Sequence, residues 1–277
     1  MCAAVLHARR EHLGGCLPDR SASGRRWRLR GHADLLHRLS RRRLVAWALV
    51  TAALSWLFGA MAGDLTDLLE PGSPTSSTVD RMVTGGPVEQ FMSLLTVMSM
   101  LLVAIAAVQR VNALAGDERA GLVELEVGLG VPRTRLFVAQ ACAAAVEAAA
   151  LTLLAGGVLA AATAAGPTDD HAVGRAFVFA VSQLPGVLAA IGIALALVGL
   201  APRLSALTWA VIGWSAFVQL FGGLVELPDR ARELGVLGHH LDVVGDPDWA
   251  PLAVQAAVGL AGAPVGLVAH RRRDLGR

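Results

Sequence analysis

Six long apolar runs dominate this sequence, and short arginine-rich or acidic stretches separate them. An α-helix needs about 20 apolar residues to cross the hydrocarbon core of a bilayer. The runs near this length lie at about residues 44–62, 91–108, 136–165, 176–200, 206–225 and 250–269. Hydrophobic residues make up 55% of the 277-residue chain, more than a soluble core of this size can hide. The pattern predicts an all-α polytopic membrane protein with six transmembrane helices.

The arginines predict the orientation of these helices. The chain has no lysine, and 20 of its 24 arginines fall before the first run, after the second, after the fourth, or at the C-terminus. Acidic residues dominate the other connections. Because basic residues are retained on the cytoplasmic side of a membrane, we expect both termini in the cytoplasm. The excess of alanine and arginine is typical of a GC-rich bacterial gene, so we expect a multi-pass protein of the bacterial plasma membrane.

The N-terminal region divides into two parts. Residues 1–24 show no periodicity, and we expect a disordered tail. Residues 25–43 hold eight arginines, with apolar residues at nearly helical spacing. This pattern fits a basic amphipathic helix on the cytoplasmic lipid surface or a solvated tail that only sets topology. The six-span domain is expected over 44–277.

Motifs for catalysis or cofactor binding are absent from the sequence. A nucleotide-binding P-loop is impossible without lysine, and neither HExxH nor Gly-x-Ser-x-Gly occurs. The three cysteines form no CxxC pair, and His239 and His240 lack enough neighbouring ligands for a metal site. We therefore expect no catalytic residue, metal or bound cofactor, and no nucleic-acid partner.

The connection after the second run, residues 109–135, has the most distinctive pattern. It contains an acidic pair, a glycine, a further acid and a basic ending, at Asp117, Glu118, Gly121, Glu124, Pro132, Arg133 and Arg135. Leu122, Leu125 and Leu129 could form an apolar stripe on a short helix. Such a helix could transmit force to a soluble partner, but a solvated connector fits equally.

This segment resembles the permease subunits of type-two ABC exporters, especially the bacterial branch that exports polyketide antibiotics and drugs. In that branch the same connection carries an acidic pair, a glycine, a glutamate and a Val-Ser-Arg-Thr-Arg-like run; Pro132 stands here where serine is usual. The turn Leu200-Ala201-Pro202-Arg203-Leu204, the Leu227-Pro228 pair with His239, and the ending His270-Arg271-Arg272-Arg273-Asp274-Leu275-Gly276 are similar too. The resemblance covers about residues 40–277.

The resemblance implies one six-span half of an exporter, most like the C-terminal half. A separate ATPase subunit would use the ATP, and residues 109–135 would dock on it as a coupling element. A second permease half, identical or different, would complete the path for a drug-like or antibiotic substrate. An ion-driven secondary transporter is the alternative, and an intramembrane enzyme is a weaker one, because Glu147 has no evident catalytic partner in the spans.

Polar residues inside the spans offer a possible substrate path. Glu147 is the one acid deep in an apolar run, where an unpaired charge is costly. Two interpretations are open: Glu147 lines the substrate path, or it fixes the packing of the helices. The spans also hold Gln140, Gln183, Gln219 and Gln255, which fit a path or interhelical hydrogen bonds equally. Pro185 and Pro264 predict kinks, and we expect Gly59-x-x-x-Gly63 and Gly262-x-x-x-Gly266 to serve packing within the half.

Overall fold

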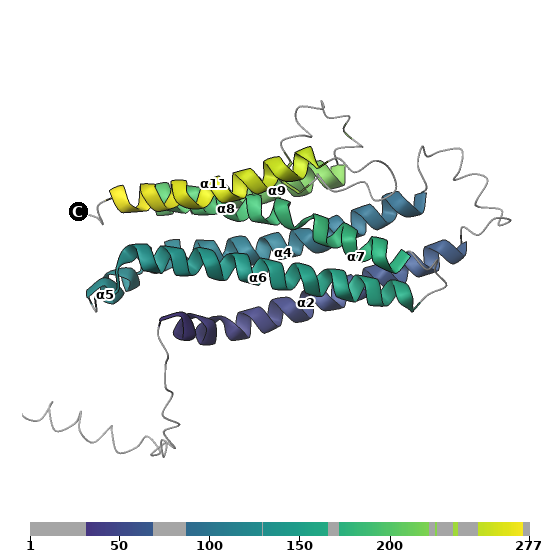
Figure 1. Cartoon of the computed structure of the whole chain (residues 1–277), viewed down its shortest axis with the longest axis horizontal. Coiled ribbons are helices and arrows are strands. Elements are labelled where there is room, and N and C mark those ends of the chain that lie inside the picture. The colour runs from purple at the N-terminus through teal and green to yellow at the C-terminus, as the bar shows by residue number, and fades with distance from the viewer. Residues whose placement is uncertain are drawn as a thin grey trace, which may run out of the picture. The chain divides into compact units, whose positions relative to one another are not determined.

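The computed structural model describes part of the chain, namely residues 32–68, 87–128, 130–165, 172–221, 225, 235–237 and 249–273. The chain divides after Arg41 into two units. Of the first unit, the structure describes the start of helix α2. The second unit, Arg42–Arg277, holds a bundle of helices (Figure 1). Residues 1–31 and the pair His239 and His240 lie outside the described residues, so the expectations for them stay predictions.

The described residues form helices and their connections. The helices are α2 (His32–Leu68), α4 (Pro87–Arg119), α5 (Leu122–Gly128), α6 (Arg133–Ala164), α7 (Ala172–Ser182), α8 (Leu184–Leu200), the 3-10 turn η1 (Pro202–Leu204), α9 (Ser205–Phe221) and α11 (Ala250–Arg272). Six stretches of these helices are long and apolar enough to span a membrane, with α7 and α8 together making one of them. The predicted six-span all-α fold is therefore confirmed. Which end of the bundle faces the cytoplasm stays a prediction.

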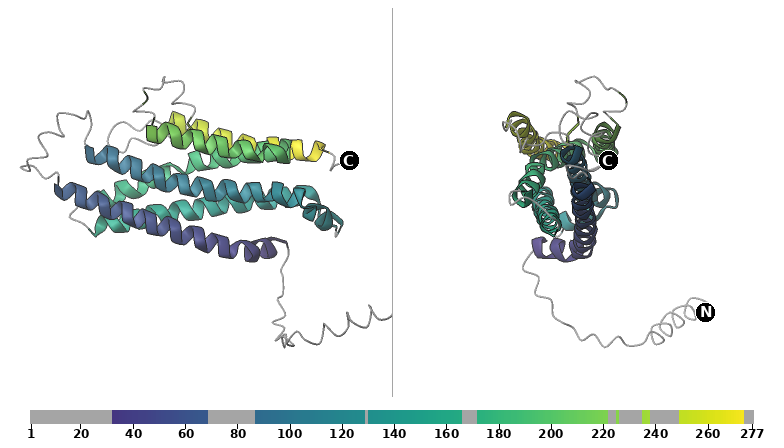
Figure 2. Two further views of the ribbon diagram at one scale, coloured as in Figure 1. Left: turned by 180° about the vertical axis from the view of Figure 1, so that it is seen from behind. Right: turned by 90° about the vertical axis from the view of Figure 1, so that its right-hand side faces the viewer.

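The spans run alternately in opposite directions (Figures 1 and 2). Trp47 of α2 donates a hydrogen bond to Gln109 of α4, and Ser55 contacts Ser99 further along, so α2 and α4 are antiparallel. As a result, the arginine-bearing start of the first span and the end of α11 lie at the same end of the bundle. We call this end, which carries Arg119, Arg133, Arg135, Arg203 and Arg271–Arg273, the arginine end.

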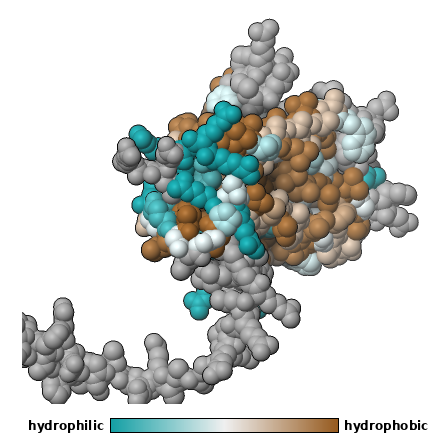
Figure 3. Space-filling model, turned by 60° about the vertical axis from the view of Figure 1, so that its left-hand side comes forward, coloured by the Kyte–Doolittle hydropathy of each residue, from teal (hydrophilic) through white to brown (hydrophobic). Residues whose placement is uncertain are grey.

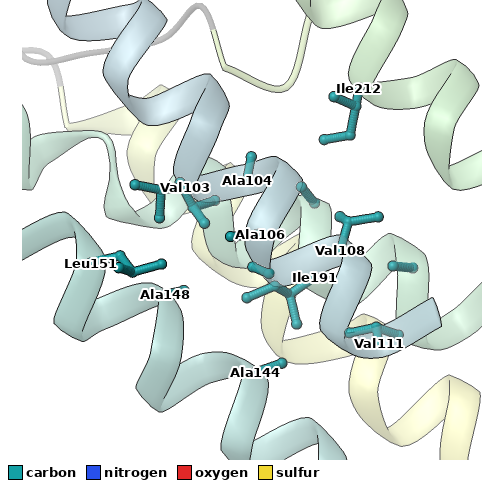
Figure 4. Close-up of a cluster of buried hydrophobic side chains, with 14 of the residues drawn as sticks. Val103, Ala104, Ala106, Val108, Val111, Ala144, Ala148, Leu151, Ile191 and Ile212 are labelled. Carbon is teal, nitrogen blue, oxygen red and sulfur yellow. The ribbon is translucent and has the colours of Figure 1, made fainter. Parts of the chain in front are cut away.

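The core is built on small aliphatic side chains. Helix α4 lies between α6, α8 and α9 and contributes Val103, Ala104, Ala106, Val108 and Val111 (Figure 4). They meet Ala144, Ala148 and Leu151 of α6, Ile191 of α8 and Ile212 of α9. Lipid tails are as apolar as these side chains, so close packing, rather than the hydrophobic effect, holds membrane helices together. Alanine and valine permit that close approach.

Helices α8 and α11 make the closest contact in the bundle. A Cβ placed on Gly262 would lie 2.2 Å from the Gly192 carbonyl oxygen, and one on Gly199 would lie 2.2 Å from that of Gly266. Only glycine fits at such distances. The Gly262-x-x-x-Gly266 spacing thus serves packing within this half, as expected. Gly59 does the same against Ala162 of α6.

The fourth span is broken where a kink was predicted. Helix α7 ends at Ser182 and α8 begins at Leu184, with Gln183 between them. Pro185, in the first turn of α8, has no N–H to bond back to the preceding turn, which explains the break. Pro264 lies inside α11, which continues through it from Ala250 to Arg272.

Candidate functional site

The connection between the second and third spans is a helical elbow rather than an extended loop. Helix α4 continues to Arg119, and the chain turns at Gly121 with a φ of +72°, a conformation that favours glycine. The short helix α5 follows, and Pro132 precedes the first turn of α6. The glycine predicted to mark this segment therefore makes the turn that separates α4 from α5.

Helix α5 exposes apolar side chains at the arginine end. Leu122 and Leu125 are 48% and 66% exposed, while Val123 between them is buried in the core. Asp117 and Glu124, which are close to these leucines in the sequence, are exposed as well. Hydrophilic residues otherwise gather at this end, whereas apolar side chains cover the flank of the bundle (Figure 3). Leu122 and Leu125 therefore offer a small apolar surface at an otherwise hydrophilic end.

Glu118 points the other way, into the bundle. Its side chain is 3% exposed and forms an ion pair with Arg273, at the end of α11. A second carboxylate oxygen lies 3.3 Å from the Nδ1 of His270. We call Glu118, His270 and Arg273 the Glu118 cluster. Because Glu118 is buried, it cannot form part of a surface that docks on another protein in this conformation.

The Glu118 cluster joins four helices. Arg273 donates to the carbonyl oxygens of Val198 and Gly199, at 3.1 and 3.4 Å, which belong to the last turn of α8. Carbonyls in a last turn lack partners within their helix, and a cation there is also favoured by the helix dipole. The His270 ring stacks on Phe137 in the first turns of α6, with centroids 5.2 Å apart. The elbow is thereby tied to the starts or ends of α6, α8 and α11.

The remaining residues of the predicted coupling element are more exposed than Glu118. Pro132 and Arg135 are exposed, and Arg133 is half-buried. Asp117 and Glu124 lie at the surface, as a docking role requires. Their role in binding an ATPase stays a prediction.

Glu147 has an ion-pair partner. Arg43, at the start of the first span, places its NH2 nitrogen 3.2 Å from a Glu147 carboxylate oxygen, and the Glu147 side chain is 6% exposed. Arg110 of α4 is buried as well. The Arg43–Glu147 ion pair links α2 to α6. This contact favours the packing interpretation of Glu147 over a role in the path.

The four glutamines have different surroundings. Gln140 donates to the carbonyl oxygen of Arg110 at 3.1 Å, and Gln255 donates to that of Val236 at 2.9 Å. Gln219 is half-buried. Gln183 is fully buried at the α7–α8 break, and neither its amide nitrogen nor its oxygen has a hydrogen-bond partner. Thr152 of α6, which packs against α7, is also fully buried with an unpaired hydroxyl.

Among the residues that the structure describes, no three His, Cys, Asp or Glu side chains come together as metal ligands. Sequence reasoning assigned no partner to Glu118 or Glu147. His270 and Arg273 stand three positions apart at the end of an apolar run, a spacing that places both on one helix face. That spacing, together with the burial expected for a histidine near a span, was the signal that could have identified the cluster.

Comparison with known proteins identifies the family. The family described as "Multidrug efflux system permease Rv1217c, C-terminal domain" matches residues 29–271. The multidrug efflux system permease protein Rv1217c of Mycobacterium tuberculosis (strain ATCC 25618 / H37Rv) is 27% identical over 277 residues, covering 98% of this chain and 50% of that protein. The chain thus spans about half the length of the relative. This chain belongs to the family of multidrug efflux permease C-terminal domains, which confirms the predicted resemblance to the C-terminal half of a drug exporter.

Proposed function

We propose that this chain is the membrane-spanning half of an ABC-type exporter that moves drug-like molecules out of a bacterial cell. A separate ATPase subunit would supply the energy, and a second permease half, identical or different, would complete the path. The arginine end would face the cytoplasm, in keeping with the distribution of basic residues. The relative's name, a multidrug efflux permease, supports the class of substrate.

The exposed leucines of α5 carry this proposal. A short helix that joins two spans, with Leu122 and Leu125 outward and Asp117 and Glu124 at the same surface, offers an apolar contact with a polar rim. Protein interfaces commonly have this composition. The turn at Gly121 sets α5 apart from α4, so a partner can contact α5 without entering the bundle.

The Glu118 cluster gives α5 a mechanical connection to the spans. A displacement of α5 by the ATPase would move Glu118, which lies three residues before Gly121. Glu118 is paired with Arg273 and lies beside His270, so the ends of α8 and α11 would move with it or the Glu118–Arg273 ion pair would break. In either case, the conformations before and after the displacement of α5 have different contacts. Only such a difference can shift a conformational equilibrium.

Gln183 is the glutamine best placed in a substrate path. Buried amides are normally hydrogen-bonded, and broken helices often form the binding sites of membrane transporters. An unpaired amide at a break would gain partners when water or an uncharged polar group of the substrate entered. Gln140 and Gln255 already donate to backbone carbonyls, and Glu147 is paired with Arg43, so packing explains them.

The test is co-purification with an ATPase. The tagged chain would be isolated in mild detergent from its native membrane, and its partners identified by mass spectrometry with an assay of ATP hydrolysis. We expect a P-loop ATPase with the wild-type chain and with Arg203→Ser, an exposed change at the same end. We expect its loss with Leu125→Glu. Absence of any ATPase from several detergents and from reconstitution, or full retention by Leu125→Glu, would overturn the proposal.

A further inference from the structure

A shallow, open groove runs along the outer face of α11 to the arginine end. It is lined by Leu200 at the end of α8 and by Ala261, Pro264, Val265, Val268, Ala269, Arg272 and Arg273. The lining positions on α11 recur every three or four residues as far as Arg272, so they form one stripe on the helix. Ala261, Pro264 and Ala269 form the apolar floor of the groove. Leu200, Val265 and Val268 lie beside them and are about half exposed.

The length of the groove matches one leaflet of a bilayer. Ala261 and Arg272 are eleven positions apart, which corresponds to about 16 Å along a helix. Half of a hydrocarbon core measures about 15 Å. A helix from a second permease half would instead be expected to follow α11 over its full span, Ala250–Arg272. The groove therefore has the length of a single lipid acyl chain.

The two arginines at the end of the groove differ in whether their charge has a partner. Arg273 is already paired with Glu118. Arg272 is exposed, and within the described part of the chain no ion pair involves it. It stands in the last turn of a span, and the ends of a membrane-spanning helix reach the headgroup region of the bilayer. A guanidinium group binds phosphate with two parallel hydrogen bonds.

We propose that this groove is a binding site for one anionic phospholipid, with an acyl chain against Ala261, Pro264 and Ala269 and its phosphate on Arg272. Basic positions at the ends of membrane helices commonly select anionic headgroups in this way. The apolar floor supplies contact without preference for a headgroup, and Arg272 supplies the preference.

The test compares two neighbouring arginines. The full chain would be purified into nanodiscs containing equal parts of phosphatidylglycerol and phosphatidylcholine, then released for native mass spectrometry to count retained lipids. We expect the wild-type chain to retain phosphatidylglycerol. Arg272→Gln should lower its retention about fivefold, the effect of one arginine near an anionic surface. Arg271→Gln removes the same charge outside the groove lining and should change little.

A second variant tests the apolar floor without altering charge. Ala261→Trp would fill the far end of the groove, and it should reduce retention of both lipids. Equal losses from Arg271→Gln and Arg272→Gln would overturn the proposal, because they would indicate a general surface charge. Retention of both lipids by Ala261→Trp, with dissociation of a permease dimer, would also overturn it and identify the groove as a protein interface.

Discussion

Replacement of Glu118 by glutamine tests the connection between α5 and the spans. The change keeps the shape of the side chain and removes the charge that faces Arg273 and His270. Removing one member of a buried ion pair costs about 3–5 kcal/mol. The Arg273 side chain is 19% exposed, so water can solvate part of its charge, and we expect the low end of this range, about 3 kcal/mol.

The assay is reversible unfolding in mixed micelles, with Asp117→Asn as the matched control. Asp117 is the exposed neighbour of Glu118, and a surface change of this kind should alter stability by less than about 0.5 kcal/mol. Arg273→Gln should cost less in the Glu118→Gln background than alone, because the ion pair is already lost. Equal stability of the Glu118 and Asp117 variants would refute the reasoning.

The same variant separates docking from coupling. Glu118 is buried, so Glu118→Gln leaves the exposed leucines of α5 unchanged. We expect the ATPase to remain bound while drug-stimulated ATP hydrolysis falls. Loss of the ATPase itself would show instead that Glu118 shapes the docking surface.

Three further predictions concern stability within the bundle. Gly199→Ala should lower the free energy of unfolding by about 1–3 kcal/mol, because the new Cβ would overlap the backbone of α11. Gly213→Ala, whose new Cβ would meet no neighbouring atom within 4 Å, should be neutral in the same unfolding assay. Glu147→Gln and Arg43→Gln should each destabilise the chain, but their double-mutant cycle should show a favourable coupling; strict additivity would contradict the ion pair. Gln183→Leu removes an unpaired buried amide and should raise thermal stability while lowering export of uncharged drugs, whereas a loss of both would indicate a structural role.

Hydropathy was sufficient to predict the six spans, because each needs only length and apolar composition. The same information could not show which of Asp117 and Glu118 faces the bundle. Adjacent helical positions differ by about 100°, so the two side chains point in different directions, but which one faces the bundle depends on Arg273, which lies 155 positions away. Sequence analysis placed Arg43 in the basic segment 25–43, interpreted as an amphipathic helix on the lipid surface or as a tail that sets topology. Its contact with Glu147 depends on how α2 lies against α6, which no local pattern encodes.

The contacts of α8 also predict where the bundle moves. Gly192 and Gly199, two turns apart on α8, touch the backbone of α11, so α8 and α11 should move as one body when the Glu118 cluster is displaced. The α7–α8 break at Gln183 then absorbs the movement of α8 relative to α7. Spin labels at exposed Val178 and Leu200 should change separation on ATP binding to the complex, whereas labels at Leu200 and Val265 should not. Equal changes in both pairs would mean that α8 slides along α11, and the coupling would have to pass through α4 and α6 instead.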